Sequence, residues 1–188
     1  MGRLVVSEFV TVDGVFEDPG GAEDFEHGGW AFKFERGEEG DKFKLDELME
    51  ADALLLGRAT YDGFAAAWPE RDDEAGFAKK MNSMPKHVVT SRDGLEWENS
   101  HAVSGDLRDQ IVKLKSATDR TLLVYGSAQL VNALVENELV DELRLMVFPT
   151  VLGKGKRLFG EGSAKSFRLT DARPVGEDGV VILTYEPR

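Results

Sequence analysis

Short apolar runs that end at glycine, each followed by a helical pattern, recur along the middle of this 188-residue chain. Residues 53–56 end at Gly57 and precede 61–68, where apolar residues recur at helical spacing. Residues 121–125 end at Gly126 and precede a second helical stripe. Strands that alternate with helices in this way predict a parallel α/β sheet, because a parallel crossover needs a connection long enough to hold a helix.

The other segments extend the same pattern. Asp106 and Ser127 precede two helical stripes and belong to the residue types that cap helices. We expect further strands at 4–10, 87–90 and 143–148, helices at 41–50, 107–114 and 130–135, and a polar loop or short helix at 71–85.

The C-terminal part differs, because no helix separates its last two predicted strands. Residues 167–173 and 180–185 flank a turn at Asp178-Gly179 and predict an antiparallel hairpin. The chain shows no repeat, linker or low-complexity tract, so residues 1–188 predict a single domain. The predicted fold class is α/β: a mixed, mostly parallel sheet with helices on both faces and an antiparallel C-terminal hairpin.

The charge balance narrows the classes of partner. The chain has 23 Lys and Arg against 35 Asp and Glu, a formal net charge of −12, which disfavours binding to nucleic acid. It has no cysteine, which excludes disulfides and a cysteine nucleophile and fits a reducing compartment. No apolar run approaches the ~20 residues of a membrane span, and the N-terminus lacks a signal-peptide pattern. We therefore expect a cytoplasmic protein without nucleic-acid or membrane partners.

Several well-known motifs are absent from the sequence. It has no GxxxxGK(S/T) phosphate loop, no GxGxxG between strand and helix, no HExxH and no GxSxG. The three histidines, His27, His87 and His101, are too scattered to indicate a metal site. Candidate chemistry therefore lies at the ends of the predicted strands, where ligands bind in open α/β sheets.

The first such strand end is suited to an anion. Gly57, Arg58, Thr60 and Tyr61 open the helix that follows residues 53–56. Unpaired N–H groups, a guanidinium and a hydroxyl therefore meet at this point. An ordinary strand–helix turn with a surface arginine is the alternative interpretation.

The second strand end carries similar groups. Thr90, Ser91 and Arg92 follow the predicted strand and add two hydroxyls and another guanidinium. A polar loop without a ligand is the alternative. With Arg58, however, two arginines now lie at strand ends of an otherwise acidic chain.

The third strand end has the glycine that close approach of a ligand requires. Gly126 leaves the backbone accessible, and the start of the next helix is able to face a pyrophosphate. Together the three strand ends indicate a polyanionic nucleotide. The residues of this third end are Tyr125, Gly126, Ser127, Ala128, Gln129 and Leu130.

A long acidic segment follows the first strand. Asp13, in its opening turn, is the candidate proton donor, and a solvated loop charge is the alternative. The carboxylates and aromatic rings of 16–40 are suited to bind or wall a flat ligand, although packing against the core explains the rings more simply. They are Glu17, Asp18, Glu23, Asp24, Glu26, Trp30, Phe32 and Phe34.

Four segments, VSEFVTVDG, LLLGRATYDGFAAAWP, KHVVTSR and LLVYGSAQLVNALVENELVDELRLMVFPTVLGKGKRLF, run through nearly the whole chain. In this order they resemble the dihydrofolate reductase-like proteins, in the branch similar to the reductase domain of the bifunctional riboflavin-biosynthesis deaminase–reductase. The resemblance implies a three-layer fold with about eight strands. It also implies NADPH as the hydride donor and a homodimer.

The resemblance assigns roles to the three strand ends. It implies that Arg58 and Thr60 grip the 2′-phosphate side of NADPH, with Ser91 and Arg92 joining from the next loop. Residues 126–130 would hold the pyrophosphate and approach the nicotinamide. Asp13-Gly14 would belong to a mobile loop over the nicotinamide and the substrate.

The sequence departs from the family pattern in two places. Gly126-Ser127 replaces the Gly-Gly of dihydrofolate reductases, and residues 71–74 lack the proline of the Asp-Asp-Pro segment of riboflavin reductases.

Taken as a whole, the resemblance predicts an NADPH-dependent reductase of a small flat heterocycle, pterin- or pyrimidine-like, acting on a C=N or C=O bond. The alternative is a non-catalytic nucleotide- or ligand-binding protein with the same fold. For the expected homodimer, Met146 and Phe148 lie on a strand face that requires cover.

Overall fold

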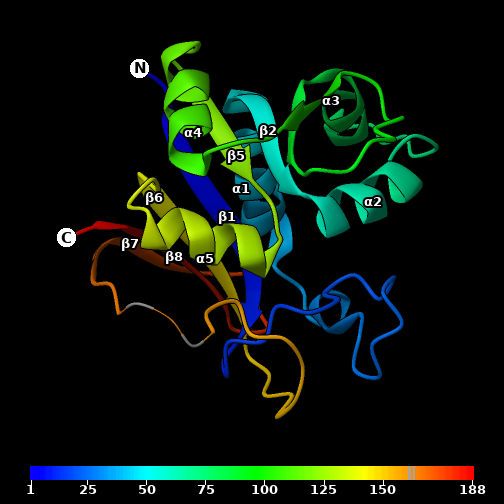
Figure 1. Cartoon of the computed structure of the whole chain (residues 1–188). Coiled ribbons are helices and arrows are strands. Elements are labelled where there is room, and N and C mark those ends of the chain that lie inside the picture. The colour runs from blue at the N-terminus through cyan, green and yellow to red at the C-terminus, as the bar shows by residue number, and fades with distance from the viewer. Residues whose placement is uncertain (161, 163) are drawn as a thin grey trace.

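The computed structural model describes residues 1–160, 162 and 164–188, and its centre is one eight-stranded sheet (Figure 1). The strand order is β4-β3-β2-β5-β1-β6-β8-β7. Strands β1 to β6 pair in parallel, whereas β8 runs antiparallel to both β6 and β7. The strands are β1 (Arg3–Thr11), β2 (Ala51–Gly57), β3 (Lys86–Val89), β4 (Ser100–Val103), β5 (Thr121–Val124), β6 (Glu142–Phe148), β7 (Phe167–Val175) and β8 (Val180–Pro187).

Helices lie on both faces of this sheet, which confirms the predicted α/β class. The apolar stripes of α4 (Leu107–Ser116) and α5 (Ala128–Glu136) pack on the face that is nearer the viewer in Figure 1. The other face is covered by α1 (Gly37–Glu50), α2 (Arg58–Ala67) and α3 (Phe77–Ser83). A short 3₁₀ helix, η1 (Trp30–Lys33), lies within the long acidic segment. None of the helices described has the length and apolar character required to cross a membrane.

Two local differences separate the structure from the sequence prediction. Strand β4 has the sequence SHAV, and its polar or exposed residues give no apolar run for the sequence to signal. The predicted cap by Ser127 is wrong, because its side chain makes no capping hydrogen bond to α5. The cap by Asp106 is present, since its side chain accepts from the Asp109 N–H at 3.0 Å.

The sheet face with Met146 and Phe148 is covered within the chain itself. Their side chains are 2% and 1% exposed. Trp30, fully buried, sets its ring edge-on to Phe148 with 5.4 Å between the ring centroids. The expectation that this face needs a second subunit is therefore wrong, because the long segment after β1 folds back over it.

Candidate functional site

The ends of β2 and β5 bring two helix N-termini into contact. A β-carbon built on Gly57, just before α2, would lie 2.3 Å from Ser127 Oγ. One built on Gly126, just before α5, would lie 2.5 Å from Thr60 Oγ1. Gly126 also has a φ of +53°, a conformation that favours glycine. Both glycines are therefore required for the two junctions to pack this closely.

Neither of these two helix starts is capped by a side chain. No capping hydrogen bond reaches α2 from Gly57 or α5 from Ser127. The N–H groups of the first turn lack intrahelical partners, and the positive ends of the two helix dipoles lie at the same place. This pair of N-termini is chemically suited to the phosphates of a dinucleotide.

Arg58 is the first residue of α2, and its guanidinium donates hydrogen bonds to other groups of the protein. Its Nε donates to Asp62 Oδ1 at 2.7 Å, and its Nη1 donates to the main-chain oxygen of Asp93 at 2.8 Å. Longer contacts of 3.4 Å reach the oxygens of Arg92 and Gly94. Arg58 therefore braces the loop after β3 against α2.

The loop after β3 presents a more available cation. The Arg92 side chain is 66% exposed, and its one ion pair, among the residues described, is a 3.9 Å contact with Asp62. Thr90 Oγ1 accepts from the Arg92 N–H at 3.0 Å and fixes the turn, while Ser91 is exposed. Arg58 and Arg92 therefore lie at the same edge of the sheet, on either side of Asp62, while Thr60 faces Gly126.

Three of the predicted site residues have their side chains in the core. Tyr61 is buried and its hydroxyl accepts from the Trp97 N–H at 2.9 Å. Tyr125 is buried and its hydroxyl donates to Glu47 Oε1 at 3.0 Å. Leu130, a residue of α5, packs in the core. Only their main-chain atoms remain for a ligand, as for Ala128, whereas the Gln129 side chain is exposed.

Glu8 belongs to this site although the strand-end patterns did not indicate it. Its side chain is 7% exposed, and its Oε1 accepts from the Gly126 N–H at 2.5 Å. Burial raises the pKa of Glu8 to about 8, against the lowering effects of the Gly126 N–H and of Lys44. The available signal was an acid inside the largely apolar run of residues 4–10, because a buried acid needs a specific partner.

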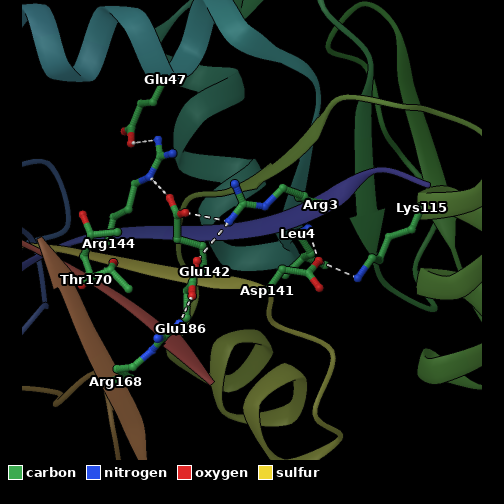
Figure 2. Close-up of polar contacts among 11 residues, drawn as sticks. Arg3, Leu4, Glu47, Lys115, Asp141, Glu142, Arg144, Arg168, Thr170 and Glu186 are labelled. Carbon is green, nitrogen blue, oxygen red and sulfur yellow. Dashed lines mark hydrogen bonds and ion pairs between the residues drawn. The ribbon is translucent and has the colours of Figure 1, made fainter. Parts of the chain in front are cut away.

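A second buried acid, Glu47 of α1, is neutralised by cations. It pairs with Lys44 of the same helix, and Arg144 Nη1 reaches its Oε2 at 3.3 Å. Figure 2 shows Arg144 continuing to Glu142 and from there to Arg3, with the N–O distances 2.5 Å and 2.7 Å. This chain of charges crosses β1 and β6 and explains how Glu47 is buried.

Asp13 has a role that opposes proton donation. Its carboxylate accepts from Thr11 Oγ1 at 2.6 Å and from the N–H groups of Gly153 and Leu152 at 2.9 and 3.3 Å. The Thr11 hydrogen bond, followed by those main-chain donors, lowers the pKa of Asp13. A carboxyl group that is ionised at neutral pH has no proton to give, so Asp13 serves to pin the loop after β6.

The acids of the segment after β1 also hold that segment in place. Glu17 pairs with Lys156 at 2.9 Å, and Glu26 pairs with Lys154. Asp18 accepts from the Ala22 N–H at 2.6 Å. Two other acids of the segment, Glu23 and Asp24, are exposed. Of the aromatic rings, Trp30 and Phe34 pack on Phe148, whereas Phe32 is 77% exposed.

Comparison with known proteins places the chain in a known domain family. The family model described as RibD C-terminal domain matches residues 3–181. The uncharacterised protein YyaP of Bacillus subtilis (strain 168) is 29% identical over an alignment of 188 residues, which covers 97% of this chain and 94% of YyaP.

Solved structures share the fold. A protein of Shewanella sp. PV-4 named for riboflavin biosynthesis has a TM-score of 0.75 at 24% identity, with 99% of both chains covered. A dihydrofolate reductase from Enterococcus faecalis, complexed with NADP(H), has a TM-score of 0.63 at 15% identity, covering 98% of this chain and 96% of that enzyme. The dihydrofolate reductase-like fold predicted from the sequence is thereby confirmed.

Proposed function

Because the chain belongs to the RibD C-terminal domain family, we propose that it is an NADPH-dependent reductase of a small flat heterocycle, pterin- or pyrimidine-like, with a C=N or C=O bond. The observation that carries the proposal is the contact between the uncapped N-termini of α2 and α5. In a chain of net charge −12, such a concentration of positive dipole is suited to the phosphates of an anionic cofactor.

The residues at this contact fit a dinucleotide. The N–H groups at the start of α5, from Ser127 to Leu130, would bind the pyrophosphate. Gly126 carries no side chain that would keep the nicotinamide away from the end of β5. When bound, NADPH supplies a hydride to the substrate, and the protein contributes orientation and the exclusion of water.

The 2′-phosphate distinguishes NADPH from NADH, and Arg92 is the residue that we assign to it. Its side chain is largely exposed and donates only weakly to Asp62, so its guanidinium is available for a bidentate contact. Arg58 supports the same loop through the Asp93 carbonyl and organises the site around Arg92. Thr60 and Ser91 contribute hydroxyls at the same edge.

Turnover tests the reductase itself. Purified protein is mixed with NADPH and a panel of oxidised pterins and pyrimidinones, and loss of the reduced nicotinamide absorbance is followed. Substrate-dependent oxidation of NADPH is the expected result. Tight NADPH binding with no turnover across the panel would instead support the non-catalytic alternative, a ligand-binding protein that retains the fold.

We further propose a homodimer in the cytoplasm. On the α5 side of the sheet, the β6–β8–β7 end presents Leu145, Leu183 and Leu169, of which the first two are half-buried and the last is 50% exposed. Leu145 packs against the apolar cluster beneath α5, whereas Leu169, on the outermost strand β7, is left exposed on this face. A contiguous apolar sheet face of this kind is suited to contact with a second copy of the chain.

The proposed location in the cytoplasm is supported by the absence of cysteine, which fits a reducing compartment.

A further inference from the structure

Glu8 lies directly beside the turn to which the proposed function assigns the dinucleotide. It belongs to β1, which pairs with β5 so that Val6 lies opposite Val124. Two residues further along both strands, Glu8 therefore reaches Gly126, and its Oε1 accepts from the Gly126 N–H at 2.5 Å. The main chain at the entrance to α5 is thus held by a buried side chain from the neighbouring strand.

The same turn is fixed by a second neighbour. Thr60 Oγ1 occupies the space that a β-carbon on Gly126 would need, at 2.5 Å from that position. Gly126 is therefore held between Glu8 of β1 and Thr60 of α2. A turn that is clamped in this way is preorganised, so little entropy is lost when a ligand binds to it.

The charge state of Glu8 then affects the affinity of this turn for an anionic ligand. A carboxylate beneath a pyrophosphate would repel it, and the exclusion of water around a 7%-exposed side chain would strengthen the repulsion. Burial raises the pKa of Glu8 to about 8, so the group is mainly a neutral acid at pH 7. The neutral acid still accepts the Gly126 hydrogen bond.

Three groups face Glu8 and act on its ionisation. The Gly126 N–H, in the turn between β5 and α5, and the Lys44 ammonium of α1 lower its pKa, while Glu47 of α1 raises it. Lys44 itself is paired with Glu47 and donates to Ser7 Oγ at 2.9 Å, so its charge is largely committed to that pair. Desolvation is the largest effect on the pKa of Glu8 and outweighs the lowering by Gly126 and Lys44.

We propose that Glu8 is a positioning residue of the cofactor site, which holds the Gly126 N–H in place for the dinucleotide and whose ionisation opposes dinucleotide binding. The inference rests on the proposed NADPH binding. Because an anionic ligand favours the protonated form of a nearby acid, cofactor affinity must fall as Glu8 ionises at alkaline pH.

The test is a set of dissociation constants for NADPH and NADH, read by nicotinamide fluorescence at pH 7 and pH 9. Wild-type protein is expected to bind both about threefold to tenfold more weakly at pH 9. Glu8→Gln retains an acceptor without a titrating charge, so it should bind as wild type does at pH 7 and lose most of the pH dependence. Glu8→Leu, which leaves the Gly126 N–H without a partner, should weaken both cofactors by about tenfold at pH 7.

Glu142→Gln is the matched control. It removes a buried acid of the Arg3 and Arg144 network, away from Gly126, and should keep the wild-type pH dependence. An equal pH dependence in Glu8→Gln and wild type, or wild-type affinity in Glu8→Leu, would overturn the inference. If Glu8→Leu does not fold, the comparison of wild type with Glu8→Gln decides. Absence of NADPH binding to wild type at both pH values would refute the proposed function and this inference together, whereas binding that is indifferent to Glu8 would refute this inference alone.

Discussion

Arg58 donates through Nη1 to the main-chain oxygen of Asp93 at 2.8 Å and so ties the start of α2 to the loop after β3. The sequence assigned the same task, contact with a 2′-phosphate, to both Arg58 and Arg92. The structure separates them, because Arg58 is engaged by Asp62 and Asp93 while the Arg92 side chain is 66% exposed. The two arginines should therefore respond differently to mutation.

Arg92→Ala should weaken NADPH selectively. Loss of a charge-assisted contact to phosphate costs roughly 1.5–3 kcal/mol, which is about one to two powers of ten in affinity. NADH lacks the phosphate and should be affected far less. The paired dissociation constants for the two cofactors measure this, with Arg188→Ala, an exposed C-terminal arginine, as the matched control.

Arg58→Ala should weaken NADPH and NADH together. Its loss frees the loop after β3 and removes hydrogen bonds to main-chain oxygens, which should also lower the free energy of unfolding by about 1–2 kcal/mol. Urea denaturation and the same pair of titrations check both effects. A selective loss of NADPH affinity in this variant would show that Arg58 contacts the 2′-phosphate itself.

Gly126→Ala should disturb the fold as well as the site. The new β-carbon would lie 2.5 Å from Thr60 Oγ1, and the residue has a φ of +53°. Overpacking and backbone strain together should lower the free energy of unfolding by about 2–4 kcal/mol. Gly63→Ala is the control, since its β-carbon meets nothing within 4 Å and it lies in α2, where alanine should stabilise the helix by about 0.5–1 kcal/mol.

Glu8 should make the stability of the protein depend on pH. Its pKa is raised from 4.5 to about 8 in the folded state, so the folded state binds more protons between these values. The stabilisation linked to the protonated group is complete below about pH 4.5 and is lost as pH rises to about 8. Relative to wild type, Glu8→Gln should therefore gain stability on going from pH 5 to pH 9, by an amount on the order of a few kcal/mol. Parallel pH profiles in urea denaturation would contradict the assignment.

The proposed homodimer predicts a species of twice the chain mass of 20.8 kDa in sedimentation at micromolar concentration. Leu169→Arg should shift it to the monomer, because Leu169 is 50% exposed on β7 at the apolar end of the sheet. Val112→Arg, at a similarly exposed position on α4, should leave the dimer intact. A wild-type protein that sediments only as a monomer would refute the proposal.

The sequence was sufficient to predict those strands and helices whose local hydrophobic pattern agrees with their tertiary environment. The buried strands around Leu54 and Leu123 and the apolar stripe of α5 carry periodicities that only one arrangement can bury, and the structure has them where predicted. Strand β4 escaped prediction because it is an edge strand whose pairing with β3 is supplied by the backbone. Local pattern has no means of signalling such a strand.

The site was predictable in part, for a similar reason. Glycines at 57 and 126 are visible in the sequence, but the contact of each with the other junction depends on how β2 and β5 pair. Glu8 was missed because its partner, the Gly126 N–H, is 118 residues away along the chain. The cover over Phe148 by Trp30 is likewise a long-range contact, which is why the sequence did not indicate that this face is buried within the chain.

The most direct test of dinucleotide binding at the α2 and α5 N-termini is a titration of the wild-type protein with NADPH and with NADH, followed by nicotinamide fluorescence at low and at moderate salt. We expect saturable binding of both, with NADPH about tenfold or more tighter, because the guanidinium of Arg92 has a phosphate to bind. Added salt should weaken NADPH more than NADH, since screening acts on the exposed arginine–phosphate pair. Absence of saturable binding by either cofactor would contradict the assignment of the α2 and α5 N-termini to a nicotinamide dinucleotide.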